Sequence, residues 1–137
     1  MSALVPRLTA SSLVTVIVAA IVFALAGPAA GVHNDLQAKL RGADFPAARG
    51  LADYDGRHGH DHRALDVKVR NISRLAGRTL VVRVHGVRLG TMQVTSTGRA
   101  HLHRHRLFAI QEGWRIRVVT QQSHKVVAIG RFVSDRG

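Results

Sequence analysis

Hydrophobic and polar residues alternate in short runs along most of the chain after the first 34 residues. In the run 63–72, for example, Leu65, Val67 and Val69 are separated by charged residues. A period of two is typical of a β-strand with one buried face and one solvated face. Alternating or β-branched residues predict strands in the following segments: 35–42, 49–55, 63–72, 78–86, 87–96, 99–107, 114–120 and 125–133.

Turn-forming residues separate these runs. Pro46 interrupts the segment 43–48, while His85-Gly86 and Thr97-Gly98 each fall between two predicted strands. Turns at intervals of about eight to twelve residues are typical of antiparallel sandwiches and barrels. After residue 31, no segment has the length and apolar spacing of a crossover helix. We therefore expect one all-β domain over residues 32–137, a single antiparallel β-sandwich or barrel of about 7–8 short strands.

The first 31 residues differ from the rest of the chain. Residues 8–26 carry no charge, Arg7 precedes them, and the small residues of 27–31 follow. With the small-x-small triplet Ala24-Leu25-Ala26, this order predicts an apolar helix that serves as a cleaved secretory signal peptide. The alternative is an uncleaved membrane anchor, because an apolar run of about 19 residues is close to the ~20 that span a bilayer. Both interpretations predict that the domain is secreted or extracytoplasmic.

Composition narrows the class of protein further. The chain has no cysteine, which excludes disulfides and a lipid anchor on cysteine. It carries 20 Lys and Arg against 8 Asp and Glu, a formal net charge of +12. A field of this sign favours an anionic partner such as a cell-wall polymer or a membrane surface. Nucleic acid is disfavoured by the expected location and by an aromatic content of 4%, which is low for base-stacking platforms.

Arginine is concentrated in the second half of the chain, where Glu112 and Asp135 are the acidic residues after residue 71. Outward positions of the predicted strands would bring four arginines into a stripe: Arg83, Arg115, Arg117 and Arg131. Because guanidinium binds phosphate and carboxylate in a bidentate way, this stripe is a candidate anion-binding site. The alternative is scattered surface charge that keeps strand edges from aggregating.

Histidine is arranged in two H-x-H-x-H runs: His58, His60 and His62 in the first, and His101, His103 and His105 in the second. On a strand, side chains two residues apart share a face about 6.5–7 Å apart, so each run could present imidazoles to one Zn²⁺, Cu²⁺ or Ni²⁺ ion. If the two segments were neighbouring strands, they would form a four-ligand site. Asp61 and Asp66 could then supply a carboxylate ligand.

Two other interpretations of the histidines stay open. Gly56 and Gly59 favour a flexible loop for the first run, and flexible histidine tracts bind metal weakly. Both runs would then belong to a solvated basic face. Because imidazole changes charge at about pH 6 to 7, a pH-dependent affinity for anions is a third interpretation.

A resemblance supports the expected fold and location. Residues 81–100 read VVRVHGVRLGTMQVTSTGRA, a strand–Gly–strand–Gly hairpin pattern, and the x-G-x-F of residues 129–132 follows it. In these features the chain resembles a loosely defined group of small, uncharacterised exported bacterial β-domain proteins. His85 stands where members of that group usually have asparagine before the hairpin glycine. The resemblance implies an exported β-domain and implies no activity.

Motifs that would indicate an enzyme are not found in the sequence. There is no G-x-S-x-G nucleophile motif, and Glu112 has no carboxylate close to it in the sequence for two-carboxylate hydrolysis. We therefore predict no catalytic residues and no cofactor other than Zn or Cu at the histidines. The expected function is that of an exported, non-enzymatic β-domain that binds anionic surfaces of the cell envelope through a basic face. A divalent-metal-binding module is the alternative.

Overall fold

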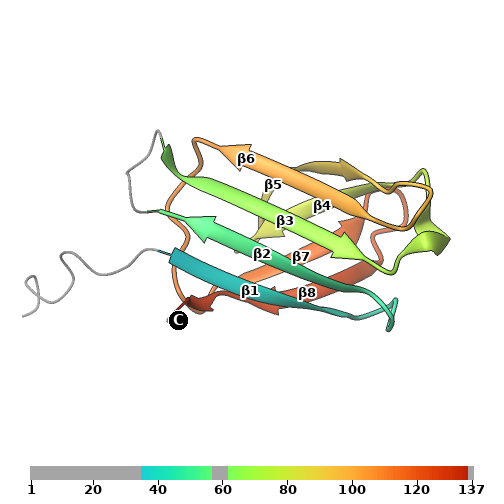
Figure 1. Ribbon diagram of the computed structural model, residues 1–137, viewed down its shortest axis with the longest axis horizontal. Coiled ribbons are helices and arrows are strands. Elements are labelled where there is room, and N and C mark those ends of the chain that lie inside the picture. Colours follow the sequence, from blue (N-terminus) through green and yellow to red (C-terminus); the bar gives the residue numbers. More distant parts are fainter. Residues whose placement is uncertain (1–34, 57–61, 136–137) are drawn as a thin grey trace, which may run out of the picture. The chain divides into compact units, whose positions relative to one another are not determined.

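Antiparallel hydrogen bonding joins the strands of the computed structural model into a single sheet (Figure 1). The structure describes residues 35–56 and 62–135. The strands in these ranges are β1 (Asp35–Gly42), β2 (Arg49–Asp55), β3 (Ala64–Arg70), β4 (Thr79–Val84), β5 (Val87–Gln93), β6 (Ala100–His105), β7 (Arg115–Thr120), β8 (Val126–Arg131) and β9 (Val133–Ser134). A one-turn 3₁₀-helix, η2 (Ser73–Leu75), lies between β3 and β4.

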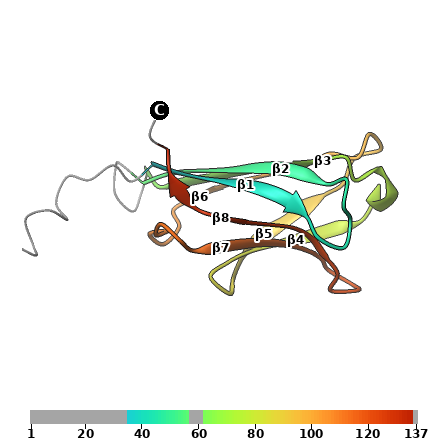
Figure 2. The same cartoon turned by 90° about the horizontal axis from the view of Figure 1, so that it is seen from below.

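The sheet curls into a barrel that is nearly closed. Its strands follow the order β5-β4-β7-β8-β1-β2-β3-β6, and β9 pairs with β1. The curled sheet forms two layers, with β1, β2, β3 and β6 in one and β4, β5, β7 and β8 in the other (Figure 2). The layers join where Arg41 of β1 pairs with Ile129 of β8. At the opposite seam β5 and β6 lie close together, because a Cβ at Gly90 would be 3.2 Å from a methyl carbon of Leu102.

The all-β architecture expected from the sequence is confirmed, and of the two shapes that the sequence left open the structure is the barrel. In β3, Leu65, Val67 and Val69 point inward and are at most 2% exposed, as a two-residue period predicts. Inward residues of both layers form one hydrophobic core. Phe132 is its largest fully buried side chain.

Most predicted segments are strands with slightly shorter ends, but the segment 125–133 is divided. β8 ends at Arg131 and β9 begins at Val133. Between them Phe132 is fully buried, and its backbone N–H donates to the carbonyl of Trp114 at 2.9 Å. The break allows β9 to pair with the beginning of β1, where Leu36 lies opposite Ser134. The last strand therefore helps to hold the first strand in the barrel.

Two turns that the sequence predicts depend on a left-handed backbone. His85 and Gly86 have φ angles of 51° and 80°, the pair of positive values found in a two-residue type I′ hairpin. Gly98 has a φ of 78°, and a Cβ at this position would lie 2.4 Å from the backbone nitrogen of Ser73. Glycine is therefore required at the turn that leads into β6.

The predicted signal peptide or membrane anchor, residues 1–31 with its apolar run 8–26, lies outside the described residues and stays a prediction. The predicted domain boundary at residue 32 also lies outside them. Within residues 35–56 and 62–135, no helix has the length and apolar character needed to cross a membrane.

Phe132 and its neighbour Val133 offer a test of where the stability of the barrel comes from. We expect Phe132→Ala to lower the free energy of unfolding by about 3–5 kcal/mol, because it removes a fully buried ring from a core without cysteines. Val133→Ala should change it by less than about 0.5 kcal/mol, since Val133 is 54% exposed. Urea unfolding of the two variants measures both values. Equal losses would contradict the assignment of Phe132 to the core.

Candidate functional site

On the outer face of β1, β2, β3 and β6, the sign of the charged side chains changes from one end of the strands to the other. Antiparallel register aligns the outward side chains into rows that run across the strands. One row places Arg41 opposite Arg49, and Arg49 opposite Arg70. The next two rows are Lys39, Leu51, Lys68 and His101, followed by Gln37, Asp53, Asp66 and His103. Cations therefore occupy one end of this face, and carboxylates occupy the other.

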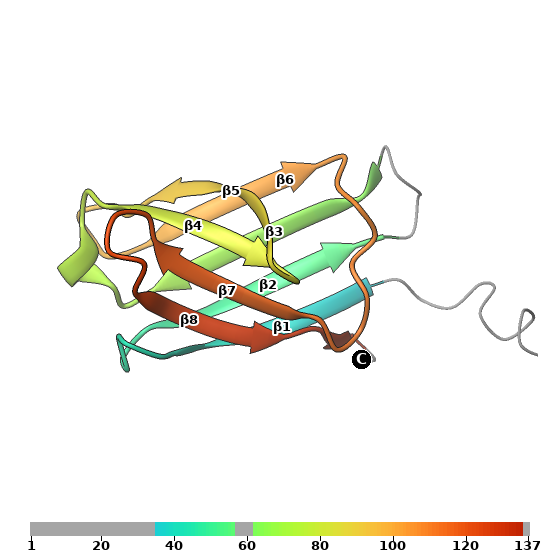
Figure 3. The ribbon, with the colours of Figure 1, turned by 180° about the vertical axis from the view of Figure 1, so that it is seen from behind.

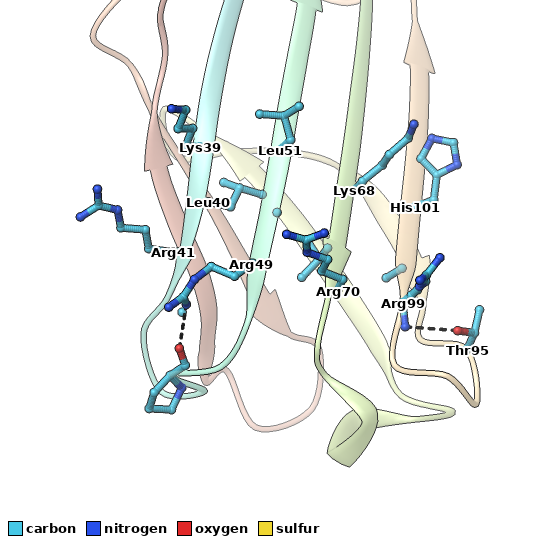
Figure 4. A pocket seen from close by; sticks show the side chains of 15 residues that line it. Lys39, Leu40, Arg41, Arg49, Leu51, Lys68, Arg70, Thr95, Arg99 and His101 are labelled. Atoms are coloured by element: carbon cyan, nitrogen blue, oxygen red, sulfur yellow. Dashed lines mark hydrogen bonds between the residues drawn. The ribbon is translucent and has the colours of Figure 1, made fainter.

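The basic end of this face is hollowed into an open groove of about 1220 Å³ (Figure 4). We call it the basic groove. Leu51 lies between the two lysines of its row, and His101 contributes from β6. In the part of the chain that the structure describes, no Asp or Glu lines the groove. Its Lys and Arg residues are Lys39, Arg41, Arg49, Lys68, Arg70 and Arg99.

Loop hydrogen bonds position two of these arginines. The Arg49 guanidinium donates to the carbonyls of Pro46 at 2.8 Å and Ala48 at 2.7 Å, which holds its side chain at the β1–β2 loop. The backbone N–H of Arg99 donates to the Thr95 hydroxyl at 3.2 Å, and the Thr95 N–H donates to the Arg99 carbonyl at 2.8 Å. This closed turn places Arg99 at the beginning of β6, beside the end of β3.

The arginines of the basic groove have no neutralising carboxylate among the described residues. In this part of the chain, two groove side chains contact a carboxylate: Lys68 Nζ lies a long 3.7 Å from Asp66 Oδ2, and His101 Nε2 contacts Asp66 Oδ1. Within the same described ranges, no ion pair involves the arginines of the groove. Like charges directly opposite each other on neighbouring strands destabilise a sheet. A bound anion would reduce the repulsion between Arg41, Arg49 and Arg70.

The four arginines predicted as a stripe also lie on neighbouring strands of the other layer, β4, β7 and β8, which Figure 3 shows side by side. Arg83 of β4 lies opposite Arg117 of β7, and Arg115 of β7 lies opposite Arg131 of β8. On the other side of Arg83, Arg88 of β5 is its partner in the register. All five are exposed. We call this set the arginine face; its role in anion binding stays a prediction.

The second histidine run lies on β6 and forms a hydrogen-bonded cluster with β3. His101 Nε2 donates to Asp66 Oδ1 at 2.5 Å, and His103 Nδ1 approaches the same oxygen at 3.3 Å. His103 Nε2 lies 2.9 Å from His105 Nε2. The sequence had suggested Asp66 as a carboxylate partner of the histidines, and the structure brings it to two of them.

Two histidines of the first run, His58 and His60, lie outside the described residues, and so does Asp61. His62 is described and precedes β3, the strand that pairs with β6. Within residues 35–56 and 62–135, no group of three or more His, Asp or Glu side chains could hold a metal ion. The four-ligand site that joins both runs therefore stays a prediction.

Asp66 has a carboxyl group whose pKa is shifted by the cluster. Burial raises the pKa of Asp66, but the hydrogen bonds from His101 and then His103 lower it. The charges of His101 and Lys68 lower it further, so the pKa lies below the usual 3.8. The ionised form of Asp66 is thus the form that the folded protein stabilises.

Sequence reasoning missed the basic groove, although the signal was present. Lys39 and Arg41 end one strand, Arg49 begins the next, and Lys68 and Arg70 end the third. Antiparallel hairpins bring the end of one strand beside the beginning of the next. That rule alone would have gathered these residues at one end of a sheet, because all of them stand at alternate, outward positions.

Comparison with known proteins adds no relative. No protein-family model matches the chain, and no curated protein matches it significantly.

The Asp66 cluster predicts a pH-dependent contribution to stability. Because the folded-state pKa of Asp66 is lowered, the contribution is present above pH 3.8 and is lost as the pH falls through the folded-state value. Urea unfolding should show Asp66→Asn less stable than the wild type at about pH 5, with the difference shrinking as the pH falls below 3.8 through the folded-state pKa.

A matched background controls this experiment. When His101 and His103 are both replaced by glutamine, the further change Asp66→Asn should cost less stability than it does in the wild type. If Asp66→Asn lowers the free energy of unfolding by the same amount at every pH and in both backgrounds, the proposed cause of the lowered pKa is wrong.

Proposed function

We propose that the domain is an exported, non-enzymatic binding module that holds a phosphate-bearing polymer of the cell envelope in the basic groove. The observation that carries the proposal is the collection of six Lys and Arg side chains in one hollow, with no carboxylate lining it among the described residues. The expected export, the resemblance to exported β-domains and the net charge of +12 support the same function.

Arginine chemistry favours phosphate as the bound group. A guanidinium offers two parallel N–H donors to a phosphate, and lysine adds point charge without a fixed geometry. The groove supplies four arginines and two lysines. Its arginines stand on neighbouring strands about 4.8 Å apart, so the row from Arg41 to Arg99 spans about 14 Å. That length suits several repeats of an extended, charged chain.

The shape of the site favours a polymer over a flat bilayer. The cations line a hollow, and Leu51 lies within it between Lys39 and Lys68. A linear chain can enter a hollow and contact both rows of cations. A planar membrane surface would meet the rim and leave the floor of the groove unused. We therefore prefer the polymer to the membrane surface that the charge alone would equally suit.

The metal-binding alternative has weaker support. Two of its histidines, His101 and His103, already donate to Asp66 in the described structure. Binding through the basic groove should not require a metal ion, so a chelator separates the two functions.

The test uses the full chain and long-chain inorganic polyphosphate as the probe. The groove variant, with Arg41, Arg70 and Arg99 each replaced by glutamine, should bind more weakly. Its salt slope, log of the association constant against log of salt concentration, should be lower by about 2 to 3, because three phosphate contacts are lost. Fluorescence titration at several salt concentrations, with and without EDTA, measures both quantities.

The control variant replaces three exposed arginines that do not line the groove, namely Arg78, Arg104 and Arg106. It removes the same charge and should keep most of the affinity. Equal weakening in both variants would show that net charge, and not the groove, causes binding. Loss of binding with EDTA would favour the metal alternative. Stronger binding to vesicles of phosphatidylglycerol and phosphatidylcholine than to polyphosphate would overturn the choice of a polymer.

A further inference from the structure

The proposed function leaves the arginine face without a role. The four strands of that layer, β4, β5, β7 and β8, carry five arginines and no Asp or Glu. Within the described part of the chain, no ion pair involves these arginines. Arg131 donates to the backbone carbonyl of Gly113 at 3.2 Å, a contact that leaves its charge in place.

The register makes this arrangement unfavourable for the isolated protein. Arg83 has an arginine opposite it on each side, Arg88 and Arg117. Arg115 and Arg131 form a further pair between β7 and β8. Scattered protective charge would not require such pairing, because a single cation per strand edge already discourages aggregation. An anion bound between such pairs would offset their repulsion through charge-assisted hydrogen bonds.

The arginine face also shares a second feature with the basic groove. Ile129, 39% exposed, lies opposite Arg117 in the register. Leu51 holds the corresponding position in the groove, between Lys39 and Lys68. Both surfaces therefore combine aligned cations with one aliphatic side chain in the same row, which suggests that they bind the same kind of polymer.

The two surfaces lie on the outer faces of different layers and adjoin at the β1–β8 seam, where Ile129 lies opposite Arg41 on one side and Arg117 on the other. The basic groove is lined by residues of β1, β2, β3 and β6, and the arginine face belongs to β4, β5, β7 and β8, which are the two layers that Figure 2 shows. Packed sheets are about 10 Å apart, and outward side chains add to that separation. Two polyanions that lie away from this seam, one over β2 and β3 and one over β4 and β7, would thus be further apart than the ~8 Å over which their repulsion acts at physiological salt.

We propose that the arginine face binds a second chain of the same phosphate-bearing polymer, so that one domain cross-links two chains. This inference rests on the proposed function of the basic groove. It makes the domain a bridge within the envelope, and it assigns the five arginines to a second site.

A two-chain capture experiment tests the bridge. Biotin-linked long-chain polyphosphate is fixed to streptavidin beads, the beads are saturated with the full chain and washed, and fluorescein-labelled polyphosphate is added. The wild type should retain the labelled chain. The face variant, with Arg83, Arg115 and Arg117 each replaced by glutamine, should bind to the beads with similar affinity but retain about tenfold less labelled chain. The groove variant should also retain less.

The variant at Arg78, Arg104 and Arg106 is the matched control, and it should capture the labelled chain as the wild type does. If the face variant captures as much as the wild type, the arginine face is not the second site. If the wild type binds the beads but captures no labelled chain, the bridge is wrong while the basic groove stands. If the wild type does not bind the beads at physiological salt, both proposals fail.

Discussion

The alignment of antiparallel strands is the constraint on which both charged surfaces depend. Side chains alternate between the two faces of a strand, so a shift of one residue in the register would move every outward cation into the core. The buried residues of β3 prevent that shift, because Leu65, Val67 and Val69 must face inward. The hydrophobic core thus determines where Lys68 and Arg70 lie, although both side chains point away from it.

A core built from aliphatic residues also has to offset the repulsion between the surface arginines. The chain has no cysteine to restrain its unfolded state, and no described ion pair neutralises the arginines of either surface. Stability has to come from burial, in which Phe132 and the inward residues of both layers take part. Binding of anions would add to it, since a ligand that binds the folded state alone stabilises that state.

Local patterns in the sequence predicted most strands and turns of this fold and the outward arginines, but not the pairing of strands that are distant in the chain. Local signals predicted β3 and the His85-Gly86 hairpin, because alternation and positive φ are properties of neighbouring residues. The order of the strands depends on contacts between distant segments, so the pairing of β3 with β6 could not be read from local patterns. Without knowledge of that pairing, nothing in the sequence indicates that His101 and Asp66, which are 35 positions apart, form a hydrogen bond. The arginine stripe was easier to predict, since all its members stand on strands with a clear outward face.

The sorting of charge along β1, β2 and β3 gives the basic groove a direction. A polyanion that ran parallel to the strands would leave the arginine row and approach Asp53 and Asp66 within two rows, where like charge would repel it. A polyanion that runs across the strands stays beside cations from Arg41 to Arg99. With the proposed polymer bound, the domain would hold it at a defined angle to the barrel, and a network of the proposed bridging domains would have a preferred crossing geometry.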